Sequence, residues 1–256
     1  MMPPVIILAG GLGMRLRSIT QDKIPKPMVS VPYQGEEYPF LVFLLSHLYA
    51  QGIRKLILCV DHLSCQIEAY FGNGQQLGME IQYDYAGSVM TAARVMHAMD
   101  KVQSAEVIVH CGDVFHPLDI GQFVETFKQH PEHAMQMAIH DNQGGEGAES
   151  NVLVDHHNQV IGFNMKKSGN NRLVLDAGIL VFKREAMSYI TDSPEASLTD
   201  DLYPALIQNH ALGAYESGEV FFDIGTPSEY FRFCTYVNET GISPILKQPP
   251  HHSELK

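Results

Sequence analysis

The 256-residue chain lacks the features that would place it at a membrane or on nucleic acid. No apolar run approaches the roughly 20 residues of a transmembrane helix, and residues 1–4 have neither the charged region nor the cleavage site of a signal peptide. Basic residues are few: 17 lysines and arginines against 29 aspartates and glutamates give a net charge of −12. Nonspecific nucleic-acid binding needs a basic face. We therefore expect a cytoplasmic protein that binds neither membrane nor nucleic acid.

Cysteine and histidine patterns typical of redox or metal sites are also missing. The four cysteines show no Cys-x-x-Cys spacing, and three of them lie in or beside apolar segments, which indicates reduced packing residues. The thirteen histidines are scattered, and His156-His157 and His251-His252 are typical of a polar turn and a tail. Because no His-x-x-x-His spacing occurs, a zinc site is not expected.

Short apolar runs alternate with helical patterns through the first half of the chain. We predict strands at residues 5–8, 55–60, 81–85 and 106–110, and helices at 40–50, 64–71 and 91–99. This alternation predicts an α/β fold with a parallel sheet and right-handed crossovers. Ligands of such sheets bind outside the carboxyl ends of the strands, which is where a glycine-rich loop and Asp113 follow.

The second half of the chain shows shorter strands and more turn signals. Residues 152–154 and 160–163 flank Asp155-His156-His157-Asn158 in the manner of a hairpin. Further strands are predicted at 173–175 and 178–182, and helices at 200–208 and 228–238. The glycine-rich residues 143–147 are the one candidate boundary. We predict a single domain over residues 1–240 and a weakly ordered tail over 241–256.

A glycine-rich segment, Leu8-Ala9-Gly10-Gly11-Leu12-Gly13-Met14-Arg15, begins at the end of the first predicted strand. Glycines let the backbone approach a phosphate closely, successive N–H groups can form an anion-binding concavity, and an arginine adds a planar cationic donor set. The segment matches neither G-x-x-x-x-G-K-[ST] nor G-x-G-x-x-G. Two interpretations stay open from these residues alone: an ordinary strand-to-helix turn, or a loop that wraps an anion.

Lys26 lies between two prolines, eleven residues after the arginine of that loop. Proline fixes its own φ angle and restricts the residue before it, so the lysine is held on a stiff, extended segment. Stiffness limits the conformational entropy that is lost when the ammonium group binds a ligand. The alternative is a surface lysine in a polyproline-like turn.

Two aspartates follow buried apolar strands. Asp113 follows Gly112 at the end of the apolar run 107–111. Asp223 ends a second apolar run and precedes Ile224-Gly225-Thr226-Pro227. Carboxylates at strand ends, beside glycines that permit close approach, suit Mg²⁺, which favours one or two carboxylates together with water and phosphate oxygens. Each aspartate could instead cap the turn or helix that follows it. Together with the glycine loop and the stiff lysine, they predict a phosphate–metal site.

The chain resembles the sugar-phosphate nucleotidyltransferases in four segments that occur in the family's order: LAGGLGMRL…PKPM, HCGDVF, LDAGILVF and FFDIGTPSEY. These enzymes join a sugar 1-phosphate to a nucleoside triphosphate and release pyrophosphate. The length and the segment SLTDDLYPALIQ are most similar to the mannose- and heptose-1-phosphate guanylyltransferases. The resemblance implies a Rossmann-like, mixed, mostly parallel sheet flanked by helices, with a smaller β-rich sugar-binding part.

The resemblance also implies roles for individual residues. Catalytic cations would be Arg15, Lys26 and Lys166, and the Mg²⁺ ligands would be Asp113 and Asp223. Nucleotide-binding residues would be Leu8, Ala9, Gly10, Gly11, Gly13, Gly87, Thr91 and Asp113. Sugar-binding residues would be Gly112, Asp176, Gly178 and Thr226. The implied partners are a nucleoside triphosphate, with GTP favoured, and a sugar 1-phosphate; a homo-oligomer is left open.

Several positions depart from the family pattern. Met14 stands in place of a threonine, Met165 in place of a glutamate and Asp176 in place of an asparagine. The segment Val89-Met90-Thr91-Ala92-Ala93 lacks the glycines of the family's base-contacting turn. Two alternatives to a sugar-phosphate guanylyltransferase stay open, the first of them motivated by the departures at Met14, Met90 and Met165. One is a homologue that binds nucleotide or sugar phosphate with weak or no catalysis, and the other is a cytidylyltransferase acting on a non-sugar phosphate such as phosphocholine.

Overall fold

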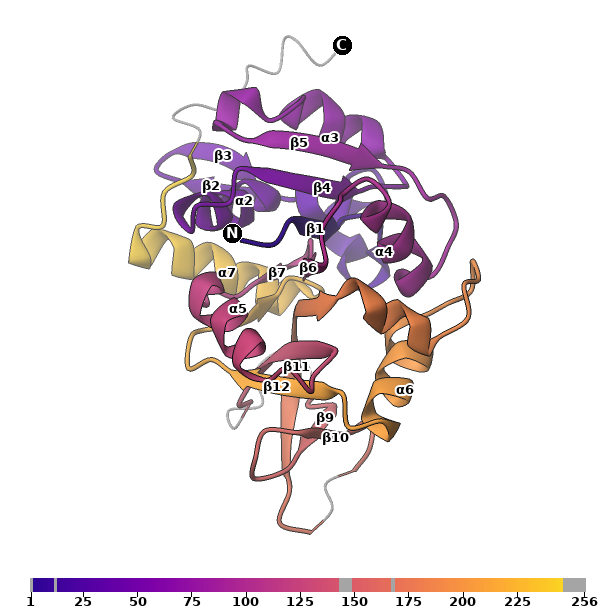
Figure 1. Ribbon diagram of the computed structural model, residues 1–256. Helices are drawn as coiled ribbons and strands as arrows, with labels where there is room; N and C mark the ends of the chain where they lie inside the picture. Colours follow the sequence, from indigo (N-terminus) through magenta and orange to yellow (C-terminus); the bar gives the residue numbers. More distant parts are fainter. Residues whose placement is uncertain (1, 12, 143–148, 167–168, 246–256) are drawn as a thin grey trace. The chain divides into compact units, whose positions relative to one another are not determined.

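The computed structural model describes residues 2–11, 13–142, 149–166 and 169–245. Contacts divide the chain into two compact units, each built from segments that are separated in the sequence (Figure 1). The first, here called the β11 unit, comprises Met1–Ile6, Ala86–His110 and His116–Phe221. The second, here called the glycine-loop unit, comprises Ile7–Tyr85, Cys111–Phe115 and Phe222–Lys256. The expectation of one domain over residues 1–240 therefore stays a prediction.

The glycine-loop unit contains parallel strands of the predicted α/β type. Strand β4 (Lys55–Cys59) pairs with β5 (Glu80–Asp84) in parallel register, and the chain leaving β1 (Val5–Leu8) donates from the Ala9 amide to the Cys59 carbonyl at 2.8 Å. The antiparallel hairpin of β2 (Ser30–Tyr33) and β3 (Glu36–Pro39) turns at Gln34 and Gly35, whose φ angles of 51° and 86° suit a tight two-residue connection.

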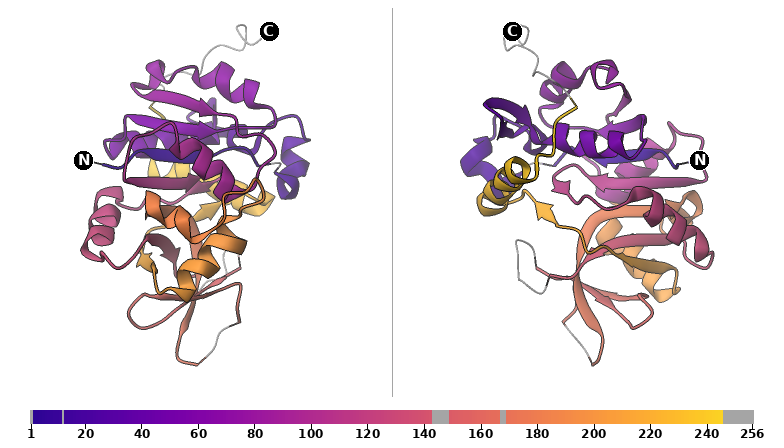
Figure 2. Two further views of the ribbon diagram at one scale, coloured as in Figure 1. Left: turned by 45° about the vertical axis from the view of Figure 1, so that its right-hand side comes forward. Right: turned by 90° about the vertical axis from the view of Figure 1, so that its left-hand side faces the viewer.

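Helices pack on these strands according to their apolar content. The helix α2 (Phe40–Ala50) is apolar on nearly every side, and residues 40–46 and Leu48 are buried, as expected for a core helix. The helix α7 (Pro227–Thr240) lies beside the β2–β3 hairpin, as the right view of Figure 2 shows, and Asn238 donates to the Pro32 carbonyl at 2.8 Å. The unit also contains α1 (Arg17–Thr20), α3 (Ser64–Phe71), β7 (Val114–Phe115) and β13 (Phe222–Asp223).

An aromatic cluster fills the core of the glycine-loop unit. The Phe233 ring, on α7, lies 4.8 Å from Phe40, 5.2 Å from Phe115 and 5.5 Å from Phe222 between ring centroids. All four side chains are buried, and each comes from a different element. This packing fixes β7 and β13 against α2 and α7; Asp113 directly precedes β7, and Asp223 is the last residue of β13.

The β11 unit is built around one long strand. Strand β11 (Arg172–Lys183) runs antiparallel to β6 (Glu106–Cys111), β8 (Met135–His140) and β9 (Val152–Val154). The β9 strand forms the predicted hairpin with β10 (Val160–Phe163), and β8 pairs in parallel with β12 (Leu212–Glu216) (Figure 1). Its helices are α4 (Thr91–Met99), α5 (Ile120–Gln129), α6 (Tyr203–Gln208), the 3₁₀ turn Arg184–Tyr189 and the π turn Leu198–Leu202.

The fold confirms the predicted α/β class, a mixed, mostly parallel sheet flanked by helices. The predicted hairpin and the helices at 40–50, 64–71 and 91–99 are also confirmed. The prediction of two separate strands at 173–175 and 178–182 is wrong. A single strand runs through residues 172–183, and its pairing with β8 shifts register between Asp176 and Leu180.

The described part of the chain contains no helix long and apolar enough to cross a membrane.

The four cysteines carry free thiols, and only Cys59 is fully buried, as a packing residue of β4. The predicted boundary at residues 143–147 lies outside the described residues, as does most of the predicted tail, from residue 246 onward.

Candidate functional site

The glycine loop leaves β1 and turns back within a few residues. Gly13 has a φ of +61° and begins the 3₁₀ turn Met14–Leu16, a left-handed conformation that glycine adopts without a Cβ clash. A Cβ on Gly13 would lie 3.4 Å from the Cβ of Lys26, so the loop and the lysine segment are in contact. A Cβ on Gly11 would meet nothing within 4 Å, which leaves the backbone there open to a ligand. Leu12 lies outside the described residues.

Lys26 is buried, not displayed on a surface turn. Pro25 is extended with a ψ of 141°, and Lys26 opens a 3₁₀ turn whose second residue is Pro27. Its side chain is only 10% exposed, and the ammonium group forms an ion pair with the carboxylate of Asp113. A buried ammonium needs a charged partner to offset its lost hydration. The interpretation of Lys26 as a surface lysine is therefore wrong.

Asp113 projects from the end of β6 at a point where two backbones nearly touch. Gly112 donates to the Leu8 carbonyl at 2.9 Å, and a Cβ on Gly112 would lie 2.8 Å from that oxygen. The glycine before the aspartate is therefore required by close packing between the ends of β6 and β1. It places Asp113, with a side chain 32% exposed, beside Lys26.

Asp223 occupies the equivalent position at the end of β13. This strand pairs antiparallel with β7, and the Ile224 amide donates to the Asp113 carbonyl at 3.0 Å. The Asp223 carboxylate accepts from the Gly225 amide at 2.8 Å and from the Arg15 guanidinium at 3.3 Å. A Cβ on Gly225 would lie 2.8 Å from that guanidinium, so a glycine at this position leaves room for the observed contact between Arg15 and the carboxylate.

The two carboxylates influence each other electrostatically. Burial raises the pKa of Asp223, the negative charge of Asp113 raises it further, and Lys26 and Arg15 act in the opposite direction. A pair of neighbouring carboxylates with oxygen donors only, one of them largely buried, is a donor set that a hard divalent cation favours. The described residues therefore fit a divalent ion at Asp113 and Asp223.

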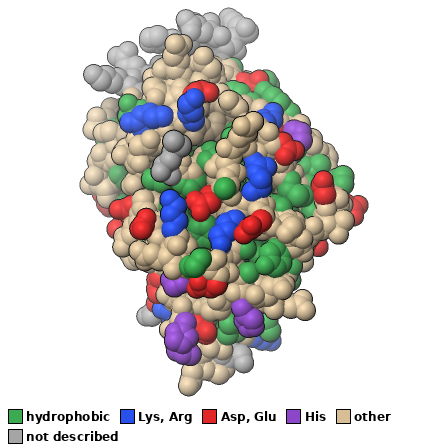
Figure 3. Space-filling model, viewed as in Figure 1, with side chains coloured by type: hydrophobic (Ala, Val, Ile, Leu, Met, Phe, Trp, Pro, Cys, Tyr) green, Lys and Arg blue, Asp and Glu red, His purple; other side chains and the backbone are tan. Residues whose placement is uncertain are grey.

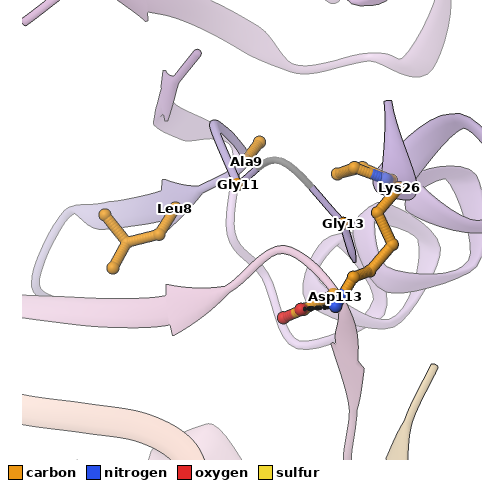
Figure 4. A pocket seen from close by; sticks show the side chains of 7 residues that line it. Leu8, Ala9, Gly11, Gly13, Lys26 and Asp113 are labelled. Carbon is orange, nitrogen blue, oxygen red and sulfur yellow. Dashed lines mark hydrogen bonds and ion pairs between the residues drawn. The ribbon is translucent and has the colours of Figure 1, made fainter. Parts of the chain in front are cut away.

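A small pocket opens between the glycine loop and the Lys26–Asp113 pair (Figure 4). Its lining residues are Leu8, Ala9, Gly11, Gly13, Lys26, Pro27 and Asp113. Apart from Pro27, each of them is a residue that the sequence predicts for nucleotide binding or catalysis. Gly10 belongs to the same loop but does not line this pocket.

Thr226 has a structural role in the described conformation. It is the N-cap of α7, and its hydroxyl accepts from the Glu229 amide at 3.4 Å and contacts the Ser228 hydroxyl at 3.0 Å. An N-cap threonine satisfies a helix amide that would otherwise lack a partner. Its predicted contact with a sugar stays a prediction.

The β11 unit carries the other predicted sugar residues on one strand. Asp176 lies at the register shift of β11, and its carboxylate accepts from the Gly178 amide at 2.8 Å and from the Tyr203 hydroxyl at 3.4 Å. Gly178 has a φ of +67°, which explains a glycine at the shift. Burial raises the pKa of Asp176 to about 6, although these two hydrogen bonds lower it. Tyr203 has no signal in the sequence that would identify it as a partner of Asp176.

Gly87 and Thr91, predicted to contact the nucleotide base, lie on either side of Met90 in a turn that is held by internal contacts. The Arg94 guanidinium donates to the Gly87 carbonyl at 2.7 Å, and the Thr91 hydroxyl accepts from the Leu198 amide at 2.9 Å. Met90 itself is 47% exposed, and its amide donates to the Pro194 carbonyl at 2.9 Å. Lys166 is exposed beside Met165.

The two groups of predicted residues belong to different units. The glycine-loop unit contains Leu8, Ala9, Gly10, Gly11, Gly13, Arg15, Lys26, Gly112, Asp113, Asp223 and Thr226, and the β11 unit contains Gly87, Thr91, Lys166, Asp176 and Gly178.

On the face seen in Figure 3, lysine and arginine side chains stand among acidic ones.

Comparison with known proteins supplies the family. The sequence profile of the nucleotidyl transferase family matches residues 4–239. The chain belongs to this family. The match includes both carboxylates, both cations and the whole glycine loop, and nucleotidyltransferases of this kind generally depend on a divalent metal ion, which agrees with the donor set at Asp113 and Asp223.

Individual relatives of this nucleotidyltransferase differ in length. A mannose-1-phosphate guanylyltransferase of Mycobacterium tuberculosis is 29% identical over 94% of this chain and 67% of its own length. A D-glycero-alpha-D-manno-heptose 1-phosphate guanylyltransferase of Campylobacter jejuni is 29% identical over 89% of this chain and 97% of its own length. The chain thus spans about two thirds of the mycobacterial protein and nearly all of the Campylobacter protein.

A solved structure supports the fold. The crystal structure of HddC from Yersinia pseudotuberculosis superposes with a TM-score of 0.77 at 24% identity, and the match covers 93% of this chain and all of that one. The resemblance of the sequence to sugar-phosphate nucleotidyltransferases is therefore confirmed at the level of family and of fold.

Proposed function

We propose that the protein transfers a nucleotidyl group from a nucleoside triphosphate, with GTP favoured, to a mannose- or heptose-type sugar 1-phosphate, giving a nucleotide-sugar and pyrophosphate. The observation that carries this proposal is the pair of ion pairs Lys26–Asp113 and Arg15–Asp223 beside an open glycine loop. Such a site offers two cations for phosphate oxygens and two carboxylates for a divalent ion. The guanylyltransferase relatives support the choice of base and sugar.

In the proposed reaction, an oxygen of the sugar 1-phosphate attacks the α-phosphorus of the triphosphate. The bond from the α-phosphorus to the oxygen that bridges to the β-phosphate breaks, and pyrophosphate leaves with that electron pair. The attacking phosphate is already an anion, so no general base is required. The barrier arises from bringing two anions together and from the charge on the leaving group, so positioning and electrostatic stabilisation dominate.

The residues of the glycine-loop unit have distinct tasks in this proposal. The amides around Gly11 and Gly13 bind the triphosphate, for which the open backbone at Gly11 leaves room. Arg15 and Lys26 hold phosphate oxygens, and both are already positioned by carboxylate partners. Asp113 and Asp223 would hold Mg²⁺, which would neutralise phosphate charge and orient the two substrates when bound.

The sugar end of the substrate is assigned to residues of the β11 unit. Lys166 supplies a cation for the sugar phosphate, and Asp176 and Gly178 supply polar groups at the register shift of β11. The Gly178 amide and the Tyr203 hydroxyl both donate to the Asp176 carboxylate, so its orientation is already fixed by the protein.

A pyrophosphate-release screen tests the proposal. Four nucleoside triphosphates are crossed with a panel of sugar 1-phosphates that includes mannose and heptose forms, with phosphocholine as a non-sugar acceptor. Turnover with GTP and a mannose- or heptose-type phosphate supports the proposal. Turnover only with CTP and phosphocholine, or nucleotide binding by calorimetry without pyrophosphate release from any pair, would replace it with one of the two alternatives.

A further inference from the structure

A cluster of three metal-ligand side chains lies in the β11 unit, in the turn that joins α5 to β8. His130 is the C-cap of α5, Glu132 follows in the turn, and His133 lies two residues before β8. One ligand atom from each of the three lies within 4.8 Å of the others. The His133 amide donates to the His130 carbonyl at 3.0 Å, so the turn itself brings the side chains together.

The protonation of His133 is determined by a fixed neighbour. The Gln159 amide nitrogen donates to the Leu212 carbonyl at 2.6 Å, which orients the side-chain amide and leaves its oxygen facing the histidine. That oxygen lies 3.1 Å from His133 Nε2, and an amide oxygen can only accept, so Nε2 carries the proton. In the neutral imidazole, Nδ1 of His133 then carries the lone pair.

The Nδ1 atom of His133 has no hydrogen-bond partner although the side chain is only 8% exposed. A buried nitrogen that could accept a bond and does not is costly, and a bound ion is one way to satisfy it. A hydrogen bond from the second ring nitrogen to a fixed oxygen is the usual arrangement of a histidine that ligates a metal through the first.

The packing around His133 preserves space for this ring. A Cβ on Gly213 would lie 2.3 Å from His133 Nδ1, so the absence of a side chain at this position of β12 is required for the ring to lie there. The His130 ring stacks on the His133 ring at 5.3 Å between centroids, and His130 Nδ1 lies 3.0 Å from the Glu132 carboxylate. His130 and Glu132, the two other members of the cluster, are therefore already close to the buried histidine.

We propose that His130, Glu132 and His133 bind a single Zn²⁺ or similar divalent transition-metal ion, with a fourth position open to water. Two imidazoles and one carboxylate are ligands that Zn²⁺ accepts, whereas Mg²⁺ and Ca²⁺ prefer oxygen donors. The ion would replace the His130–Glu132 hydrogen bond by shared coordination and would clamp the α5–β8 turn onto the strand pair β8–β12. This site is separate from the carboxylates proposed for catalysis, and it does not depend on the proposed function.

Metal binding to the full chain tests this inference directly. Protein stripped with a chelator is titrated with Zn²⁺ by calorimetry, and with Co²⁺ by visible absorption, both with Mg²⁺ in large excess to occupy oxygen-donor sites. We expect one equivalent to bind, with the absorption bands of four-coordinate Co²⁺ and a higher unfolding temperature with Zn²⁺. Absence of a stoichiometric site in the wild-type protein would overturn the proposal.

Variants then locate the site. We expect Gln159→Met, which removes the oxygen that fixes His133, to weaken Zn²⁺ binding about 10–100-fold, as loss of such an outer partner usually does. His130→Ala and Glu132→Gln should weaken it at least as much, and both positions are exposed, so these variants should fold. The control is His156→Ala with His157→Ala, two exposed histidines of the β9–β10 turn. Unchanged affinity in His130→Ala and Glu132→Gln, or loss of binding in the control, would overturn the assignment.

Discussion

The Arg15 guanidinium lies 3.3 Å from the carboxylate of Asp223, although 208 positions separate the two residues in the sequence. A Cβ on Gly225 would lie 2.8 Å from the guanidinium, so the glycine leaves room for this contact. It couples the glycine loop after β1 to the turn that begins α7. The proposed phosphate and metal ligands are thus held in place by each other before any substrate binds.

Replacing Asp223 with asparagine should abolish most activity. The change removes one of the two charges proposed to hold the metal ion and the partner of Arg15, and we expect turnover to fall on the order of 10²–10³-fold. The measurement is pyrophosphate release at saturating Mg²⁺, with circular dichroism to confirm the fold. Asp22→Asn is the matched control, since it removes the exposed ion pair between Arg17 and Asp22, two residues outside the pocket. Equal rates in the two variants would contradict the role of Asp223.

Lys26→Ala should also lower turnover on the order of 10²–10³-fold. The lysine is buried at the pocket and supplies positive charge that no other group on its segment can replace, because Lys23 is exposed and lies outside the pocket. Steady-state kinetics of Lys26→Ala and of the control Lys23→Ala make the comparison. If Lys23→Ala loses as much activity as Lys26→Ala, the loss reflects the total positive charge of the segment, which would contradict a specific role of Lys26 in the pocket.

Gly112→Ala should destabilise the protein by about 1–3 kcal/mol, the usual range for forcing an extra methyl group into a packed interior. The new Cβ would lie 2.8 Å from the Leu8 carbonyl oxygen, so the ends of β6 and β1 must separate. Chemical denaturation measures the free energy of unfolding. Gly218→Ala is the control, because a Cβ there meets nothing within 4 Å. A neutral Gly112→Ala would show that these strand ends do not pack closely.

Asp176 makes stability depend on pH in an unusual direction for a carboxylate. Its folded-state pKa of about 6 lies above the ordinary 3.8, so the folded state binds more protons between these values and its stability falls as pH rises from about 4 to 6. Above pH 6 the ionised group costs on the order of 1–3 kcal/mol. Asp176→Asn keeps an oxygen for the Gly178 amide and removes the charge.

We therefore expect Asp176→Asn to be more stable than the wild-type protein at pH 7.5, by roughly the cost of the buried charge, and equally stable near pH 4. Denaturation at a series of pH values from 4 to 8 measures the difference between the two proteins. A constant difference over this range would show that the carboxylate titrates normally. Asp155→Asn provides a contrast, since hydrogen bonds from the Gln159 and His157 amides lower the pKa of that carboxyl despite a desolvation effect that opposes them.

Local patterns in the sequence were sufficient for much of the fold. The helices at 40–50, 64–71 and 91–99 follow from apolar spacing and from terminating residues that act within a few positions. The long strand β11 was predicted as two strands, at 173–175 and 178–182, because the register shift against β8 between Asp176 and Leu180 depends on pairing between strands and has no local signal. The helix α5 was not predicted, although its apolar residues Ile120, Phe123, Val124 and Phe127 recur at helical spacing.

The candidate site was predictable as a set of residues but not as a set of pairs. Glycines at strand ends and a lysine between prolines indicate chemistry locally, whereas the pairing of Lys26 with Asp113 and of Arg15 with Asp223 depends on tertiary packing. The same limit explains why the cluster of His130, Glu132 and His133 was not predicted. Its sequence spacing, two positions and then one, is unlike common zinc motifs. Its strongest feature, the orientation of His133 by Gln159, depends on a residue of the connection between β9 and β10, which is distant in the sequence.

The central claim is that Lys26, Arg15, Asp113 and Asp223 together support nucleotidyl transfer to a sugar 1-phosphate. The most direct measurement follows nucleotide-sugar and pyrophosphate in one reaction, for the wild-type protein and for Lys26→Ala and Asp223→Asn, with the substrate pair that the screen identifies. The account predicts equal amounts of the two products, dependence on both the sugar 1-phosphate and a divalent ion, and loss of both products in the variants. Pyrophosphate release that is independent of the sugar phosphate, or full product formation by both variants, would contradict it.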